Sequence, residues 1–265
     1  MGGPVEHVFV GGVKAATLSR AEFTRLIVED CLERRAAGKT APPALLFDSN
    51  GHGISMAARD PAYAGALKAA DAVHADGGWI VLASRLVAGA SIPDRSATTD
   101  MIHDLAAAGL GHELSHFLLG ATEEVNAGCA ERLRQLYPGI HIAGRHHGYF
   151  TADEEASVIA AIGAVAPDLL WIGLGKPREQ LFAVRHRDAL RASWAITCGG
   201  GFNYVTGHYR RAPRWMQRSH LEWLFRAVTT PKLLWRYATT SPHAIWLAAT
   251  RIDRRRVPPP PTAKQ

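Results

Sequence analysis

Residues 117–173 run FLLGATEEVNAGCAERLRQLYPGIHIAGRHHGYFTADEEASVIAAIGAVAPDLLWIG. Short apolar runs alternate in this stretch with longer segments whose apolar residues recur at helical spacing. The strands expected here are Phe117–Gly120, Ile140–Ala143 and Leu169–Gly173, and the helices are Glu123–Leu136 and Asp153–Val165. A helix through Leu190 and a strand at Ala195–Cys198 continue the repeat. Such a repeat with short links predicts a doubly wound parallel sheet, an α/β fold with a Rossmann-like core.

The same alternation extends upstream to about Val8. It predicts helices at Leu18–Ala36, Asp60–Ala70 and Thr99–Ala108, and strands at Ala44–Phe47 and Ala72–His74. Ser19 is a suitable N-cap for the first of these helices. Ligands of doubly wound sheets bind beyond the carboxyl ends of the strands. The loops after those ends are therefore the first candidates for a site: Asp48–Gly51, Ala75–Gly78, Gly173–Pro177 and Gly199–Gly201.

The composition is that of a globular chain of 265 residues, 47% hydrophobic and 20% charged, which excludes a disordered or collagen-like protein. The three cysteines form no CxxC pair, so neither a disulfide framework nor a cysteine zinc site is expected. Met1–Val13 lacks the pattern of a signal peptide. No apolar run reaches the roughly 18 residues that a membrane span needs. We therefore expect a cytoplasmic protein that meets a membrane only from its surface.

The basic residues gather in the last part of the chain. Residues 210–265 carry 12 Lys and Arg against 2 acids, a net +10, whereas residues 1–209 carry 18 against 22, a net −4. Four of the seven Trp also lie in that segment. Two amphipathic helices are expected there, one with the stripe Leu221, Leu224, Phe225 and Val228 and one starting at Pro231, before a disordered end at Pro258–Pro261. Such a segment suits an anionic lipid surface, with nucleic acid binding and a solvated face as alternatives.

We accordingly expect residues 1–209 to form the core and residues 210–265 a membrane-docking appendage. Within the core, residues 1 to about 110 are expected to form the acceptor and active-site half, and residues 111–209 the nucleotide-sugar half.

The string His112-Glu113-Leu114-Ser115-His116 matches HExxH, which on a helix places two His on a zinc ion with Glu as base. Glycines precede it and an apolar strand follows it, so no long helix is expected to hold that geometry. A zinc hydrolase remains the alternative function. No Asp-x-Asp occurs, so a metal-clamped nucleotide-sugar site of the usual type has no obvious ligands. Arginines would then have to neutralise a leaving diphosphate.

Three strings together resemble the WecG/TagA/CpsF family of bacterial glycosyltransferases. They are Ala75-Asp76-Gly77-Gly78, Leu170-Trp-Ile-Gly-Leu-Gly-Lys-Pro-Arg-Glu-Gln180, and Arg211-Ala212-Pro213 followed by Leu221-Glu-Trp-Leu-Phe-Arg226 and Trp235-Arg236-Tyr237. Tyr137-Pro138 and His147-Gly148-Tyr149-Phe150 also match the family pattern.

The resemblance implies an inverting, metal-independent enzyme that moves a sugar from a UDP-sugar to a polyprenyl-diphosphate-linked saccharide in cell-surface polysaccharide synthesis. It implies no cofactor besides the donor, no nucleic acid, and a peripheral position on an anionic membrane surface, the cytoplasmic face of the bacterial inner membrane. Self-association is expected by analogy with the family. The donor sugars that the resemblance allows are N-acetylmannosamine, its uronic acid and glucuronic acid.

Residue by residue, the resemblance implies that Asp76 is the general base and Asn50 a pocket residue. Arg95 matches an active-site arginine of the family, and Arg211 and Arg226 match tail arginines that close over the diphosphate. The other substrate-binding residues implied are Asp48, Gly77, Tyr149, Gly175, Arg178, Glu179, Gln180 and Asn203.

The sequence departs from the family pattern in four places. Asp48 replaces a frequent Thr, Glu179-Gln180 exchanges the amide and carboxylate of a PxQE-like segment, Thr98 replaces a Gly, and Asn203 replaces an Asp. All four fall around the expected sugar pocket, so they leave the reaction class standing and open the identity of the donor sugar. The carboxylates of Asp48 and Glu179 weigh against a uronic acid donor.

Overall fold

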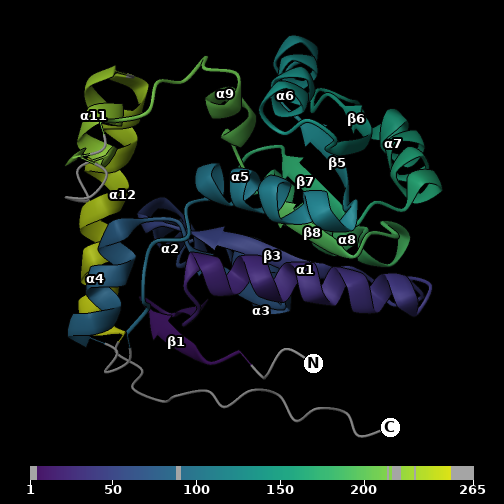
Figure 1. Cartoon of the computed structure of the whole chain (residues 1–265). Helices are drawn as coiled ribbons and strands as arrows, with labels where there is room; N and C mark the ends of the chain where they lie inside the picture. The colour runs from purple at the N-terminus through teal and green to yellow at the C-terminus, as the bar shows by residue number, and fades with distance from the viewer. Residues whose placement is uncertain (1–4, 88–90, 214, 217–221, 230, 252–265) are drawn as a thin grey trace, which may run out of the picture.

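The computed structural model describes residues 5–87, 91–213, 215–216, 222–229 and 231–251 (Figure 1). Its centre is a six-stranded parallel sheet in the order β4-β3-β8-β7-β5-β6. The strands are β3 (Ala44–Ser49), β4 (Ala72–Ala75), β5 (Ser115–Gly120), β6 (His141–His146), β7 (Leu169–Gly173) and β8 (Trp194–Thr197). The predicted α/β fold with a Rossmann-like parallel sheet is confirmed.

Helices cover both faces of this sheet. They are α1 (Arg20–Ala36), α2 (Gly51–Ala57), α3 (Pro61–Ala69), α4 (Gly78–Val87), α5 (Thr98–Gly109), α6 (Glu123–Leu136), α7 (Ala152–Val165), α8 (Arg178–Arg185), α9 (Gly201–Val205), α11 (Glu222–Thr229) and α12 (Pro231–Thr250), with short 3-10 turns at Leu110–His112 and Arg187–Ala189. One buried cluster joins the sheet to α1, α5, α6 and α9, and a second joins it to α2, α3, α4, α7, α8 and α12.

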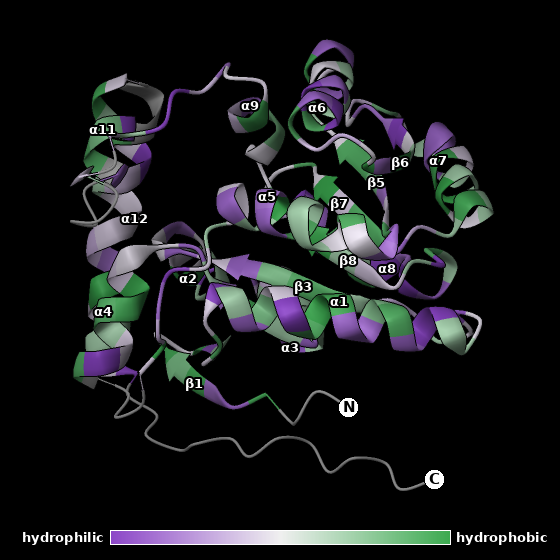
Figure 2. Cartoon of the chain, in the orientation of Figure 1, coloured by the Kyte–Doolittle hydropathy of each residue, from purple (hydrophilic) through white to green (hydrophobic). Residues whose placement is uncertain are grey.

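Burial on both faces explains why the strands read as continuous apolar runs rather than alternating ones. Every residue of β3, β5 and β7 is buried, and the side chain of Trp171 on β7 is fully enclosed. Figure 2 shows these strands as mostly hydrophobic, whereas the edge strand β6 is more polar.

Helix starts follow the capping residues in the sequence. The Ser19 side chain accepts a hydrogen bond from the Glu22 N–H, and the Glu22 side chain accepts one from the Ser19 N–H. This capping box begins α1 as predicted. The Asp60 side chain caps α3 by accepting hydrogen bonds from the N–H groups of Ala62 and Tyr63, with Pro61 at the first helical position.

The structure contains a hairpin and three helices that were not predicted from the sequence. β1 (His7–Val10) and β2 (Val13–Ala16) form a hairpin whose turn residues, Gly11 and Gly12, both have positive φ. A Gly-Gly pair between two apolar runs is a hairpin signal, so the sequence contained this information. α4 was also missed, as were the short helices α2 and α9.

The tail helices α11 and α12 stand along one end of the molecule beside α4 (Figure 1). The last part of α12 packs against α2, and its Ala244, Leu247 and Ala248 are buried in the core. Leu221 and the proline-rich end, which carried part of the tail prediction, lie outside the described residues. No helix within the described ranges is both long and apolar enough to cross a membrane.

Candidate active site

The carboxyl ends of β4, β3, β8 and β7 lie next to one another because these strands are neighbours in the sheet. Ser49 and Ala75 are register partners, so the residues that follow them, Asn50 and Asp76, emerge side by side. The Asn50 Nδ2 lies 3.4 Å from Asp76 Oδ2 and 3.5 Å from Asp48 Oδ2. Its Oδ1 accepts a hydrogen bond from the Gly53 N–H at 3.0 Å, which fixes the amide at the start of α2.

Asp76 is half-buried, with its backbone N–H bonded to Ser49 O at 2.8 Å. Its Oδ1 accepts a hydrogen bond from the Thr98 N–H at 3.3 Å, at the N-terminus of α5, where the N-cap residue Ala97 supplies no side-chain acceptor. The positive end of the α5 dipole therefore faces this carboxylate. Two long hydrogen bonds leave acceptor capacity on both oxygens, so the carboxylate can still take a proton from a ligand. Gly77, which follows, is half-buried beside Asn50.

Asp48 is neutralised inside the protein. The Lys176 Nζ forms an ion pair with Asp48 Oδ2, and the Thr197 hydroxyl donates to Asp48 Oδ1 at 3.3 Å. Burial raises the pKa of Asp48, but Lys176 and His74 lower it by more, so the carboxyl stays ionised. Burial opposes the charge of Lys176, and Asp48 is the main group that raises the pKa of this lysine above its usual value.

Glu179 joins two of the strand-end loops. Its Oε2 accepts hydrogen bonds from the backbone N–H groups of Gly175 and Gly199, each at 3.0 Å, and its Oε1 accepts one from Gln180 Nε2 at 3.2 Å. Burial, followed by the Asp48 charge, raises the pKa of Glu179 to about 7. Both Glu179 and Gln180 are fully buried. Glu179 therefore shapes the loops and, like Asp48, presents no free negative charge to a donor sugar.

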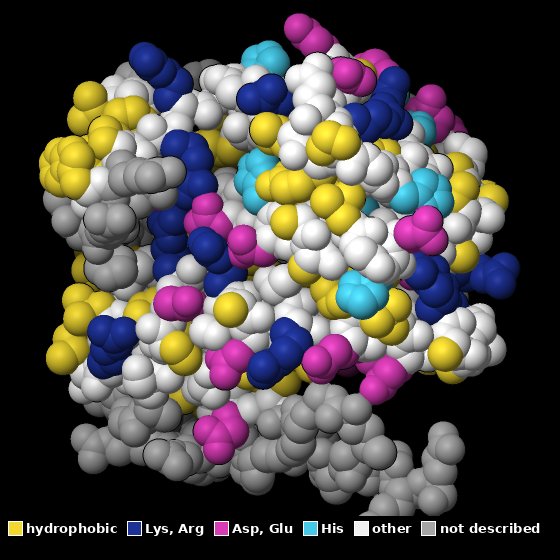
Figure 3. Space-filling view, in the orientation of Figure 1, with side chains coloured by type: hydrophobic (Ala, Val, Ile, Leu, Met, Phe, Trp, Pro, Cys, Tyr) yellow, Lys and Arg dark blue, Asp and Glu magenta, His cyan; other side chains and the backbone are white. Residues whose placement is uncertain are grey.

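An arginine cluster lies beside Asp76. Arg95 precedes α5 and Arg226 lies on α11, and both form ion pairs with Glu222. The Arg226 guanidinium also lies over the Tyr204 ring of α9, 4.8 Å from its centroid. Burial opposes the charge of Arg95, but Glu222 and then Asp76 raise its pKa above the usual value. Figure 3 shows basic side chains gathered where the tail helices meet the core.

Other predicted residues lie around this centre. Arg211 forms an ion pair with Asp100 in the first turn of α5, and that carboxylate lies 3.6 Å from Arg95. Asn203 is half-buried on α9. Arg178 supports the turn after β6 by donating to Gly148 O at 2.8 Å and to Phe150 O at 3.3 Å.

That turn leaves the Tyr149 side chain 75% exposed. A Cβ placed on Gly148 would come within 3.0 Å of Leu174, so the turn lies close to the loop that holds Gly175. Tyr149 is thus available to a ligand over the ends of β5 and β7.

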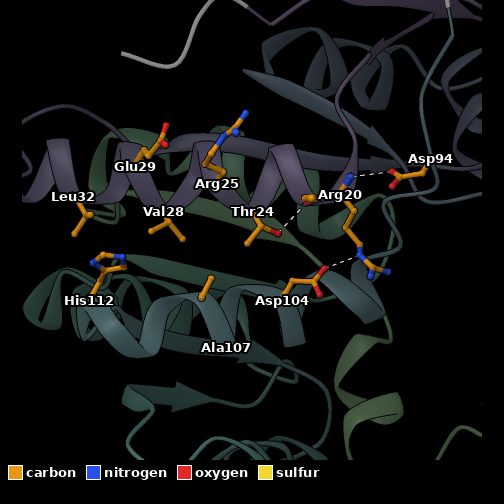
Figure 4. Close-up of a pocket in the computed structure, with 12 residues that line it drawn as sticks. Arg20, Thr24, Arg25, Val28, Glu29, Leu32, Asp94, Asp104, Ala107 and His112 are labelled. Carbon is orange, nitrogen blue, oxygen red and sulfur yellow. Dashed lines mark hydrogen bonds and ion pairs between the residues drawn. The ribbon is translucent and has the colours of Figure 1, made fainter.

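The HExxH string does not form a zinc site. Glu113 has a left-handed backbone (φ 51°) between a 3-10 turn and β5, so the two His are not on one helix. His116 is buried and accepts a hydrogen bond from Trp171 Nε1 at 3.2 Å. His112 lines a cavity of about 710 Å³ between α1 and α5, whose lining contains none of the strand-end residues (Figure 4). In the part of the chain that the structure describes, no three His, Cys, Asp or Glu are placed to hold a metal ion.

Four residues of the site were not predicted from the sequence, namely Lys176, Thr197, Tyr204 and Glu222. Lys176 and Glu222 each lay within a motif that carries the family resemblance. A Lys or Glu in such a motif indicates an ion pair, and its partner can be a residue that is distant in the sequence.

Comparison with known proteins agrees with this architecture. The sequence model of the family "Glycosyl transferase WecG/TagA/CpsF family" matches residues 8–257. A protein of Bacillus spizizenii named N-acetylglucosaminyldiphosphoundecaprenol N-acetyl-beta-D-mannosaminyltransferase is 32% identical over 192 residues, 72% of this chain and 70% of the relative. Proteins of the same name from Bacillus subtilis and Staphylococcus aureus (strain MRSA252) are 31% identical over 185 residues (69% of this chain, 70% of the relative) and 28% identical over 193 residues (72% and 74%). The chain therefore belongs to the WecG/TagA/CpsF family and is a glycosyltransferase.

Proposed function

We propose that this protein transfers a sugar from a UDP-sugar to a polyprenyl-diphosphate-linked saccharide, with inversion and without a metal ion. The names of its relatives support N-acetylmannosamine as the sugar and an N-acetylglucosaminyl-diphosphoundecaprenol acceptor. The observation that carries the proposal is the half-buried Asp76 carboxylate, held by Asn50 and the start of α5 beside Arg95.

In this mechanism Asp76 accepts the proton of the acceptor hydroxyl as its oxygen attacks the anomeric carbon of the donor. The attack comes from the side opposite the leaving diphosphate, which inverts the configuration at that carbon. Negative charge grows on the leaving UDP, and the guanidinium groups of Arg95 and Arg226 stabilise it. These arginines do the work that a divalent cation does in other transferases, and Asp48, paired with Lys176, has no free charge to bind one.

The donor sugar would lie against the loops that Glu179 ties together, and the exposed Tyr149 ring offers a stacking surface for the nucleobase. Because the Asp48 and Glu179 carboxylates have partners of their own, they do not repel an acidic sugar as free charges would. These two carboxylates are therefore compatible with a uronic acid donor. The names of the relatives still favour the neutral N-acetylmannosamine.

A composite surface of α4, α11 and α12 suits docking on an anionic membrane. Leu86 of α4 and Trp235 of α12 are each 76% exposed, and Val228 of α11 is 74% exposed. Among the side chains that the structure describes on these helices, the exposed large apolar ones are Leu82, Leu86, Leu224, Val228, Leu234, Trp235, Ile245 and Trp246. Figure 3 shows apolar side chains along this edge. Exposed apolar and indole side chains of this kind insert at the level of lipid headgroups. We place this surface on the cytoplasmic leaflet.

The experiment is a UDP-release assay in EDTA with UDP-N-acetylmannosamine, its uronic acid and UDP-glucuronic acid, and a short-chain polyprenyl-diphosphate N-acetylglucosamine as acceptor. We expect acceptor-dependent release with one donor, and a loss of roughly 10²-fold or more in Asp76→Asn, which keeps the shape but removes the base. Asp153→Asn, on the exposed first turn of α7, is the matched control and should retain activity. Near-normal turnover by Asp76→Asn would disprove the assigned base, and silence with every donor would disprove the reaction.

A further inference from the structure

Glu222 is a carboxylate of the tail that is buried against the core. It opens α11, yet its residue is only 5% exposed. Its Oε2 lies 2.5 Å from Arg95 Nη1, across 127 residues of sequence, and its Oε1 lies 2.7 Å from Arg226 Nη2, one turn along the same helix. One carboxylate thus connects an arginine of the core with an arginine of the tail.

The two ion pairs explain why a charged group is tolerated at this position. Burial alone would raise the pKa of Glu222, but Arg226 and Arg95 lower it by more, so the carboxylate stays charged. Without that charge the two guanidinium groups would repel one another, because the other carboxylate paired with Arg95, that of Asp100, lies at 3.6 Å and forms no such bridge to Arg226. Glu222 therefore determines whether Arg95 and Arg226 can stay side by side.

Glu222 does not use up the donors of the two arginines. A guanidinium carries five N–H groups, and each ion pair engages one nitrogen. The Arg226 Nε is buried and has no hydrogen-bond partner among the described residues. A buried donor without an acceptor is costly, and a ligand oxygen would satisfy it. The Tyr204 ring under Arg226 holds the plane of its guanidinium.

We propose that Glu222 is a positioning residue that holds Arg95 and Arg226 together next to Asp76, so that the diphosphate of the donor meets a preformed pair of guanidinium groups. The inference deepens the proposed function and rests on it for the identity of the diphosphate. It assigns Glu222 no contact with the substrate. It also gives the tail helix a second role, because the same carboxylate fastens α11 to the loop before α5.

The test measures the binding of three probes, namely uridine, UDP and inorganic pyrophosphate, by calorimetry. Glu222→Gln keeps the shape and removes the charge, and Glu222→Asp keeps the charge on a shorter side chain. We expect Glu222→Gln to weaken the binding of UDP and pyrophosphate about tenfold or more and to leave uridine binding unchanged. A displaced guanidinium would lose its charge-assisted contact with the diphosphate, and a loss of this size corresponds to one such contact. Glu222→Asp should restore part of the loss. The matched control is Glu123→Gln on α6, which removes the exposed 2.5 Å ion pair to Arg145 of β6 and should change the binding of none of the three probes.

Each other outcome is informative. Unchanged or tighter UDP binding by Glu222→Gln would overturn the inference, and tighter binding would mean that Glu222 competes with the diphosphate. An equal loss for uridine and UDP would also overturn it, because that pattern indicates a general structural defect. If the wild-type protein binds pyrophosphate but not UDP, the proposed donor is wrong while the effect of Glu222→Gln on pyrophosphate still decides the inference. If the wild-type protein binds none of the three, both fall.

Discussion

Lys176→Met should be one of the most destabilising single substitutions in the site. The side chains of Lys176 and Asp48 are only 10% and 7% exposed, and they form an ion pair. Methionine fills the space of the aliphatic stem but leaves the Asp48 carboxylate without its cation. Removal of one partner from a buried pair costs about 3–5 kcal/mol. For a chain of this size that corresponds to a fall in Tm of roughly 6–20 °C.

The pH dependence separates this cause from a packing defect. In the wild-type protein the pKa of Asp48 is lowered, although burial raises it, because Lys176 is the largest opposing influence. Without Lys176, burial dominates, and the folded-state pKa rises above the 3.8 of the unfolded chain. A group with a raised folded-state pKa stabilises the fold at low pH and loses that contribution as the pH rises. The stability deficit of Lys176→Met should therefore be largest at pH 7.5 and smaller at pH 5.

The assay is guanidinium chloride unfolding at both pH values. Lys68→Met, an exposed lysine on α3, is the control and should stay within about 0.5 kcal/mol of the wild type. The double variant Asp48→Asn/Lys176→Met, which buries no charge, should recover much of the loss. A deficit under about 1 kcal/mol at pH 7.5, or one of equal size at both pH values, would refute the reasoning, since breaking a buried pair costs several times that amount.

Three further predictions concern other parts of the molecule. Glu179 has a folded-state pKa of about 7 against 4.5 in the unfolded chain, so its contribution to stability should be lost as the pH rises from about 4.5 through 7. The unfolding free energy of the wild type relative to that of Glu179→Gln, measured across that range, should therefore fall. Leu86→Asp should reduce co-sedimentation with anionic vesicles while leaving the melting temperature unchanged, because this side chain is exposed on α4; equal sedimentation would count against the docking surface. Ser19→Ala should lower the unfolding free energy by about 1 kcal/mol through loss of the α1 cap, read out by guanidinium chloride unfolding.

Local signals predicted the fold well where periodicity and capping agree. Glu123–Leu136 and Leu169–Gly173 have the predicted bounds, because a strong helical period and a fully apolar run admit few alternatives. The α4 helix was not predicted because it begins at the second of two glycines, and its exposed Leu82 and Leu86 break the rule that apolar residues turn inward. Such exposure is what a docking surface requires.

The sequence predicts which positions form the site, but not which of their charged side chains are neutralised by ion pairs. The family motifs named Asp48, Asp76 and Arg226. The sheet order brings the segments of Asp48 and Asp76 together, and Glu222 links Arg226 to Arg95. Whether Asp48 is a free anion depends on Lys176, which lies 128 residues away, and no local pattern reports a pairing over that distance. The same holds for Glu222, which a helical pattern shows only as a polar residue off the apolar stripe.

The helix α11 shows why the docking surface and the active site depend on one another. Glu222 and Arg226 are one turn apart and face the core, whereas Leu224 and Val228, also one turn apart, are 41% and 74% exposed. Residues two positions apart on a helix point to nearly opposite sides. Under the proposed function, the eight residues of α11 would present a diphosphate-binding arginine on one face and a lipid-binding surface on the other. If Asp76 is the base that we propose, a lipid-linked acceptor has to reach it from the membrane, and docking through Leu224 and Val228 would place the membrane about one helix diameter from Arg226.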